Sequence, residues 1–98
     1  MFPCVIKTFA DPAARAIFEK GKIPKSFPAS IYRRALVKLQ LVDAAHDLED
    51  LRFPPGNRLE QLAGDREGQH SIRINDQWRI CFVWTGADAE NVEIVDYH

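Results

Sequence analysis

The stretch 57-NRLEQLAGDREGQHSIRINDQWRICFVW-84 decides the fold, because apolar residues recur at every second position along most of it. HSIRIN (residues 70–75) and QWRICFVW (residues 77–84) show this alternation most clearly. A period of two is typical of β-strands that bury one face. Two glycines mark the turn AGDREG (residues 63–68), and the dipeptide ND (residues 75–76) joins the segment HSIRIN to the segment QWRICFVW. With NRLEQL (residues 57–62), the stretch therefore predicts three consecutive strands of an antiparallel sheet.

The residues before this stretch predict one strand and two helices. CVIKTF (residues 4–9) has the composition of a first strand. Asp11 followed by Pro12 is a helix-start signal, because an Asp side chain caps free N–H groups and Pro fits the first helical position. Gly21 predicts the end of that helix. From residue 28 to residue 45 a second helix is predicted by apolar residues at helical spacing, namely Tyr32, Ala35, Leu36, Leu39 and Val42.

After the stretch, NVEIVDY (residues 91–97) predicts a last strand, which TGADAE (residues 85–90) joins to the strand before it. The order of elements is therefore β-α-α-β-β-β-β. This order predicts a small α+β domain over residues 1–98. We expect a twisted, mainly antiparallel sheet with the two helices packed on one face.

The composition is that of an ordinary globular domain. The chain has 98 residues, 46% hydrophobic and 28% charged, and contains no apolar run near the ~20 residues that span a bilayer. The start MFPCVIKTFADP also lacks the layout of a signal peptide, so we expect a cytoplasmic protein without a membrane partner. Cys4 and Cys81 lie far apart in apolar runs, which predicts buried reduced thiols. No His or Cys spacing predicts a metal site.

The charge is uneven along the chain, although the net charge is −1. Residues 7–38 hold eight Lys or Arg against two acids, whereas residues 61–98 hold three Arg against seven acids. The basic first half predicts a surface for phosphates or for an acidic partner. Solvated helix faces are the alternative interpretation.

Alternation along the strands predicts which side chains share a face of the sheet. The apolar side chains of the three longer strands point one way, toward the helices. The opposite face then carries Arg73, Arg79, Glu93 and Tyr97. Two guanidiniums and a phenol suit the phosphate and the base of a nucleic acid. An ordinary solvent-exposed face is the alternative.

One set of motifs extends over nearly the whole chain: IKTF (residues 6–9), L.GDR.GQ.SI.IN..WRI.F (residues 62–82) and the terminal DYH (residues 96–98). In these motifs the chain resembles HigB-type toxins, the plasmid-maintenance killer proteins of the RelE/ParE superfamily. The resemblance implies a RelE-like fold and an mRNA endoribonuclease that acts on the ribosome, in the decoding site. It also implies a HigA-type antitoxin with a helix-turn-helix domain as partner, and no small-molecule cofactor.

Cutting RNA without a metal requires a base for the 2′-OH proton, a cation for the charge on the phosphoryl oxygens, and an acid for the leaving 5′-oxygen. The resemblance makes Arg79 the cation, and Arg73 on the neighbouring strand is second in rank. His98 is then the acid, because imidazole changes charge near neutral pH. Tyr97 either donates a proton or stacks on a base.

The chain departs from its relatives in one catalytic stretch. They carry His and Lys in a segment like LHPLKGD, whereas this chain has LEQLAGD (residues 59–65). Glu60 replaces the histidine, and it either acts as the base or only pairs with Arg58 or Arg79. Ala63 replaces the lysine, so that positive charge is missing. The residues that we expect to contact RNA are Arg66, His70, Gln77 and Asp96.

Two other classes of function stay open on the sequence alone. A ParE-like protein that inhibits DNA gyrase has the same fold but needs neither a base nor an acid nor a terminal Tyr-His pair. A toxin with weakened catalysis, kept as an antitoxin-binding or regulatory partner, is consistent with Ala63.

Overall fold

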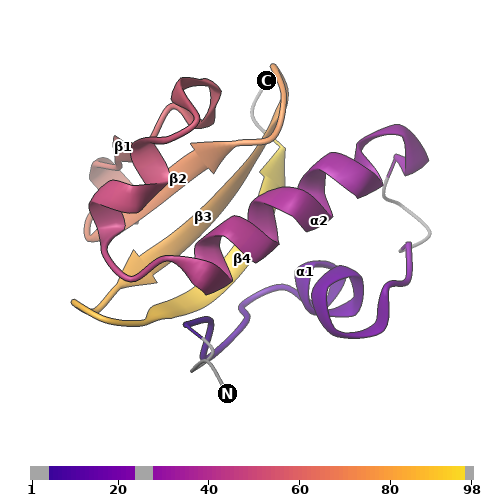
Figure 1. The fold of residues 1–98 in the computed structure, drawn as a ribbon, viewed down its shortest axis with the longest axis horizontal. Coiled ribbons are helices and arrows are strands. Elements are labelled where there is room, and N and C mark those ends of the chain that lie inside the picture. The colour runs from indigo at the N-terminus through magenta and orange to yellow at the C-terminus, as the bar shows by residue number, and fades with distance from the viewer. Residues whose placement is uncertain (1–4, 24–27, 97–98) are drawn as a thin grey trace.

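The computed structural model describes residues 5–23 and 28–96. The helical elements are α1 (Pro12–Arg15), the π-helical turn η1 (Ala16–Lys20), α2 (Ala29–Ala44) and the 3-10 turns η2 (Leu48–Arg52), η3 (Pro55–Asn57) and η4 (Gly64–Arg66). The strands are β1 (Glu60–Gln61), β2 (Gln69–Arg73), β3 (Trp78–Trp84) and β4 (Ala89–Asp96). They form one antiparallel sheet in the order β1-β2-β3-β4, and α2 lies across it with α1 beside it (Figure 1). The predicted α+β class is confirmed.

The start and the end of the first helix follow the predicted signals. The Asp11 side chain accepts a hydrogen bond from Ala13 N at 2.9 Å, and Pro12 occupies the first turn. Gly21 ends η1 with a φ of 63°, in the left-handed region that glycine adopts without strain. The other oxygen of Asp11 accepts from Ile94 N at 3.2 Å. The cap therefore also fastens this helix to β4.

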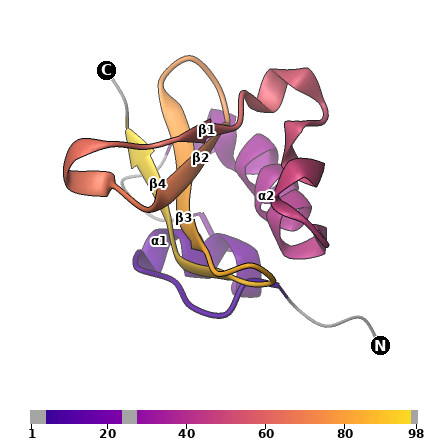
Figure 2. The ribbon, with the colours of Figure 1, turned by 90° about the vertical axis from the view of Figure 1, so that its left-hand side faces the viewer.

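One hydrophobic core joins both helices to the sheet. The buried face of α2 is centred on Ala35, Leu39 and Val42, as predicted, but Ile31 belongs to it, whereas Tyr32 is only half-buried. From the sheet, the fully buried members of this core are Ile72, Ile80, Phe82, Ala89 and Val92. Ile80 and Phe82 alternate along β3, and Ile72 lies opposite Ile80, which confirms the predicted faces of β2 and β3. Figure 2 shows the sheet turned, with α2 on one side of it.

The strand predicted over residues 4–9 is wrong as a regular strand. Among the described residues 5–9, two isolated parallel bridges, at Ile6 and Phe9, join the segment to β4. The backbone N–H groups of Val5 and Ile6 donate to the main-chain oxygen and the carboxylate of Asp43 (3.3 and 3.0 Å). Between the two bridges, Asn91 of β4 has a φ of 53° and donates its N–H to Thr8 Oγ1 at 2.8 Å, which interrupts the ladder.

The strand predicted over residues 57–62 is also shorter in the structure. Asn57 still belongs to η3, and Arg58 has a φ of 48°, which is not an extended conformation. β1 is therefore reduced to two residues, although Leu62 N still donates to Gln69 O at 2.8 Å. A short edge strand of this kind leaves little backbone open to pairing with another chain.

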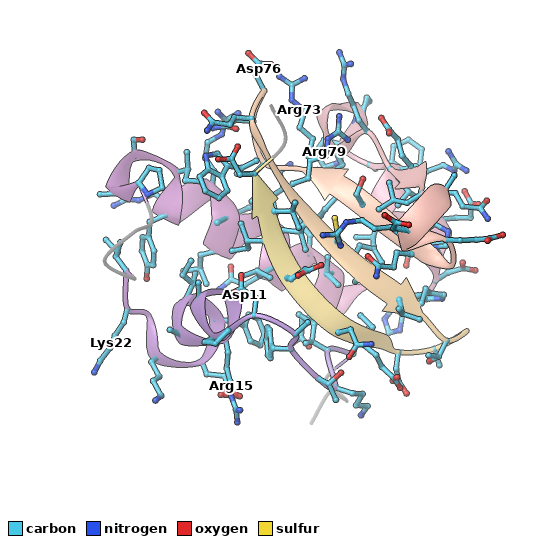
Figure 3. The ribbon with its side chains drawn as sticks, turned by 180° about the vertical axis from the view of Figure 1, so that it is seen from behind. Asp11, Arg15, Lys22, Arg73, Asp76 and Arg79 are labelled. Carbon is cyan, nitrogen blue, oxygen red and sulfur yellow. The ribbon has the colours of Figure 1, made fainter. Side chains whose placement is uncertain are left out.

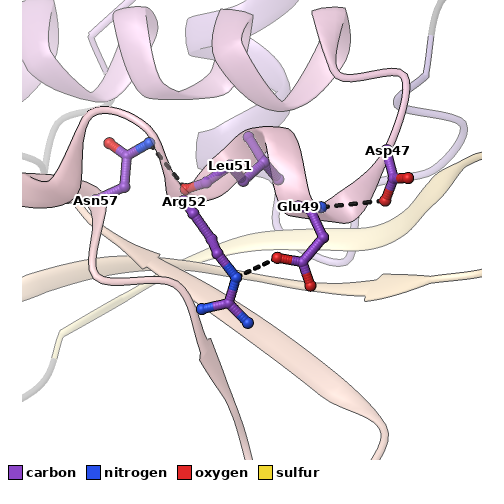
Figure 4. A network of polar contacts seen from close by, with 5 residues as sticks. All are labelled: Asp47, Glu49, Leu51, Arg52 and Asn57. Carbon is purple, nitrogen blue, oxygen red and sulfur yellow. Dashed lines mark hydrogen bonds and ion pairs between the residues drawn. The ribbon is translucent and has the colours of Figure 1, made fainter.

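The connection from α2 to β1 is organised by the side chain of Asn57, which is fully buried. Its amide donates to the carbonyl of Leu51 at 3.2 Å (Figure 4) and to that of Phe53 at 3.1 Å. Its oxygen accepts a hydrogen bond from Lys38 Nζ on α2. These bonds fix the path of the chain toward Glu60. Among the helices of the described ranges, none has the length and the apolar character to cross a membrane.

Candidate functional site

The sheet face opposite the helices carries two neighbouring rows of side chains. The strand register aligns one row across all four strands, made of Glu60, Ser71, Cys81 and Glu93. The adjacent row contains Arg73, Arg79 and Val95. Ser71 and Cys81 are fully buried, which indicates that the longer side chains of this face lie over them. The predicted burial of Cys81 is confirmed, and Cys4 lies outside the described residues.

Arg73 and Arg79 are direct partners across β2 and β3. Figure 3 shows both near the turn that joins these strands, with Asp76 in that turn. Like charges on directly opposed residues repel one another. Asp76 forms an ion pair with Arg73 and thereby offsets this repulsion. The structure thus brings together the two arginines that the sequence placed on one face.

Glu60 and Arg79 form an ion pair across this face. The carboxylate oxygen lies 3.4 Å from Arg79 Nη1. The side chain of Glu60 is 53% exposed, whereas that of Arg79 is only 20% exposed. A half-exposed carboxylate beside a guanidinium can bind that guanidinium, and it can also reach a ligand that approaches from solvent. The structure therefore contains the predicted ion pair of Glu60 with Arg79, and the role of Glu60 as general base stays a prediction.

Arg66 reaches the same face from η4. Gly64 and Gly68 bracket this turn with φ values of 67° and 92°, which permit its tight reversal. Arg66 Nη1 donates to Gln69 Oε1 at 3.1 Å and to the carboxylate of Glu93 on β4. Since β3 lies between β2 and β4, this ion pair ties the turn before β2 to the far strand of the sheet.

Two carboxylates of this site, Asp76 and Glu93, were not among the predicted site residues. Alternation had already placed Glu93 on the arginine face, so its position was predictable. Its partner was not, because Arg66 comes from an irregular turn whose path no periodicity describes. Asp76 follows Arg73 by three residues within a tight turn, and that spacing was the available signal.

His70 lies on the other face of the sheet. It alternates with the buried Ile72 and lies opposite Phe82 of β3, and the two rings stack with their centroids 6.3 Å apart. Its Nδ1 is buried and has no hydrogen-bond partner among the described residues. Burial lowers the pKa of His70 below its ordinary value. The structure therefore does not bring His70 together with the arginines.

The remaining predicted residues lie at one end of the sheet or beyond it. Gln77 is exposed in the β2–β3 turn, where its backbone N–H donates to Asn75 Oδ1 at 2.9 Å. Asp96 ends β4 opposite Trp78. Tyr97 and His98 lie outside the described residues. Over residues 5–23 and 28–96, no three His, Cys, Asp or Glu side chains gather as metal ligands.

A small antiparallel sheet with two helices on one face and paired arginines on the other has the architecture of RelE-like toxins. Residues 7–98 match the model of a family described as the RelE-like toxin of type II toxin-antitoxin system HigB. The chain therefore belongs to this family. The resemblance inferred from its motifs is confirmed, and membership implies a cognate antitoxin.

Three curated proteins illustrate the relationship. Toxin HigB-1 of Vibrio cholerae is 41% identical over 83 residues, which cover 85% of this chain and 87% of that protein. Endoribonuclease HigB of Proteus vulgaris is 35% identical over 94 residues, which cover 96% of this chain and 100% of that protein. An uncharacterized protein of Haemophilus influenzae is 28% identical over 92 residues, with 94% and 91% covered.

Proposed function

We propose that this toxin is an endoribonuclease that cleaves mRNA on the ribosome, in the cytoplasm, and that a HigA-type antitoxin with a helix-turn-helix domain neutralises it. The name of the Proteus vulgaris relative supports the reaction class. The observation that carries the proposal is the direct pairing of Arg73 with Arg79 on the face that the helices leave uncovered. Two adjacent guanidiniums are well suited to a phosphodiester, because each can fork across two oxygens.

The proposed reaction is an attack of the ribose 2′-oxygen on the adjacent phosphorus. A bond forms between them while the bond from phosphorus to the 5′-oxygen breaks. Arg79 stabilises the negative charge that gathers on the phosphoryl oxygens, and Arg73 orients the same phosphate. Glu60, 3.4 Å from Arg79, takes the proton of the 2′-OH. His98 gives a proton to the leaving 5′-oxygen, and Tyr97 stacks on the base or assists that transfer.

The other proposed contacts with RNA come from the edges of the arginine face. Arg66 lies over the face through its bond to Glu93, which supports our expectation that it contacts the RNA backbone. Gln77 and Asp96 belong to the end of the sheet where Arg73 and Arg79 lie. His70 is not included, because its ring packs on Phe82 on the other face of the sheet.

The test is to express the chain inducibly, map the 5′ ends of cellular mRNA, and measure the supercoiling of a plasmid. We expect breaks in phase with codons for the wild type. We expect none for Arg79→Ala or for a chain that lacks Tyr97 and His98, because each lacks a group that the reaction needs. Arg15→Ala is the matched control, since Arg15 pairs with Glu19 on the exposed side of the first helix.

A second candidate function is a toxin with weakened catalysis that mainly binds its antitoxin. Ala63 favours it, because relatives carry a lysine at that place and alanine supplies neither charge nor hydrogen bonds. Intact messages and normal growth on expression would support this second candidate. Intact messages with altered supercoiling would instead indicate a gyrase inhibitor, and either result would contradict the nuclease.

A further inference from the structure

The helix layer carries a second charged surface, on the other side of the sheet from Arg73 and Arg79. Side chains of α2 line a groove there, namely Ser30, Arg33, Arg34, Val37 and Lys38. They follow the helical spacing i, i+3, i+4, i+7 and i+8, and so form one stripe along the helix. This stripe runs beside the buried stripe that contains Ala35 and Leu39. The groove is therefore an outer surface of the molecule, away from the arginine face.

The positive charge of this groove is not neutralised by its own helix. The single acid of α2, Asp43, caps the backbone of Ile6 instead. Among the described residues, no ion pair involves Arg33, Arg34 or Lys38. Burial, and then the neighbouring Arg34, lower the pKa of Lys38. Three cations thus share one helix face, and none of them has an ion-pair partner within the described ranges, which favours an anionic ligand.

The groove also has an apolar component. Val37 lies among the cations and is 48% exposed, and Phe53 is 71% exposed. Phe53 is close to the groove, because Asn57 accepts a hydrogen bond from Lys38 Nζ and donates one to the Phe53 carbonyl. Exposed apolar side chains rimmed by charged ones mark surfaces that bind other proteins.

We propose that the surface formed by Arg33, Arg34, Val37, Lys38 and Phe53 binds an acidic segment of the cognate antitoxin that also carries apolar side chains. Carboxylates of the segment would pair with the guanidiniums, and its apolar side chains would cover Val37 and Phe53. A polypeptide fits this surface better than RNA does, because the apolar residue among the cations, Val37, is aliphatic and gives a base no ring to stack on. The inference rests on the antitoxin in the proposed function, and it does not depend on RNA cleavage.

The test compares two charge-reversed variants of the full chain in calorimetric titrations with the purified antitoxin. The double variant R33E/R34E reverses two exposed charges in the groove. The matched control, K7E/R15E, reverses two exposed charges outside it. We expect R33E/R34E to bind the antitoxin at least about tenfold more weakly, since attraction becomes repulsion at two positions. K7E/R15E should bind like the wild type, and the thermal unfolding of both variants should stay normal.

A third variant, V37D, tests the apolar component without removing a cation. It should also weaken binding by about tenfold, because it puts a carboxylate where apolar contact is expected. Unchanged affinity in both R33E/R34E and V37D would overturn the inference. So would normal antitoxin binding combined with weaker binding to ribosomes, since the surface would then contact RNA. If the wild type failed to cut mRNA but R33E/R34E still lost the antitoxin, the nuclease would be refuted and the docking surface supported.

Discussion

Replacing Glu60 by glutamine separates the two roles that this carboxylate can have, general base or ion-pair partner of Arg79. Two unit charges 3.4 Å apart attract by about 1 kcal/mol in water and by about 5 kcal/mol at an effective dielectric constant of about 20. Because the Glu60 side chain is 53% exposed, the value for water is the closer one. We therefore expect Glu60→Gln to change the free energy of unfolding by less than about 1 kcal/mol.

The effect on catalysis should be much larger. A positioned general base contributes about 10²- to 10⁴-fold to the rate of proton transfer. We expect Glu60→Gln to slow the single-turnover cleavage of mRNA on purified ribosomes by about 100-fold or more. Urea denaturation of the same preparation measures the stability. Glu49→Gln is the matched control, because it removes an exposed carboxylate from another arginine, Arg52, in η2.

Full activity in Glu60→Gln would refute the role of base and leave only the ion pair. A decrease of several kcal/mol in the free energy of unfolding would contradict the weak attraction expected of a solvent-exposed ion pair. It would show that Arg79 needs Glu60 to keep its position on the sheet. Reduced activity in the Glu49→Gln control would show that the assay reports unfolding and not chemistry.

The other predictions concern single residues. Burial lowers the pKa of His70, so below a pH of about 6.5 the His70 imidazole takes up a proton more readily in the unfolded chain than in the folded one. The free energy of unfolding should therefore fall as the pH drops through this range. His70→Phe should remove that fall, as measured by urea midpoints above and below this pH. Ala63→Lys should raise the cleavage rate about tenfold by restoring a cation near the phosphate, and a fall in rate would mean that the site is arranged differently. Asn57→Ala should lower the free energy of unfolding by about 2–3 kcal/mol in urea titrations, because two loop carbonyls and Lys38 lose their partner. An unchanged midpoint would show that the Asn57 side chain does not hold that loop.

Much of the fold could be predicted from the sequence because its signals are local. The period of two in residues 69–84 identifies β2 and β3 and their buried face. Asp11, Pro12 and Gly21 mark the first helix through backbone chemistry that is complete within a few residues. The segment 4–9 has the composition of a strand, but its ladder with β4 is interrupted at Asn91, which has a φ of 53° and donates its N–H to the Thr8 hydroxyl. The amino-acid composition of the segment gives no sign of this interruption.

In the candidate site, too, some positions follow from local sequence signals and others only from the folded structure. The shared face of Arg73 and Arg79 follows from alternation and register. The position of His70 on the helix side follows from the same alternation with Ile72, whereas an RNA contact of His70 stays a prediction. The bond between Arg66 and Glu93 joins residues 27 positions apart through a turn without periodicity, and only the folded structure reveals it.

The ion pairs of the arginine face have a consequence for binding selectivity. RNA in solution binds proteins mainly through the counterions that Lys and Arg release when they neutralise phosphates. Three arginines of this face are already paired with carboxylates, in the pairs Arg66–Glu93, Arg73–Asp76 and Arg79–Glu60. A paired arginine releases fewer counterions when it meets a phosphate, because its charge is already partly neutralised. Bulk cellular RNA therefore gains little by adsorbing here. An RNA already immobilised in a matching orientation loses little freedom on contact, and it can replace each internal anion with one of its own phosphates.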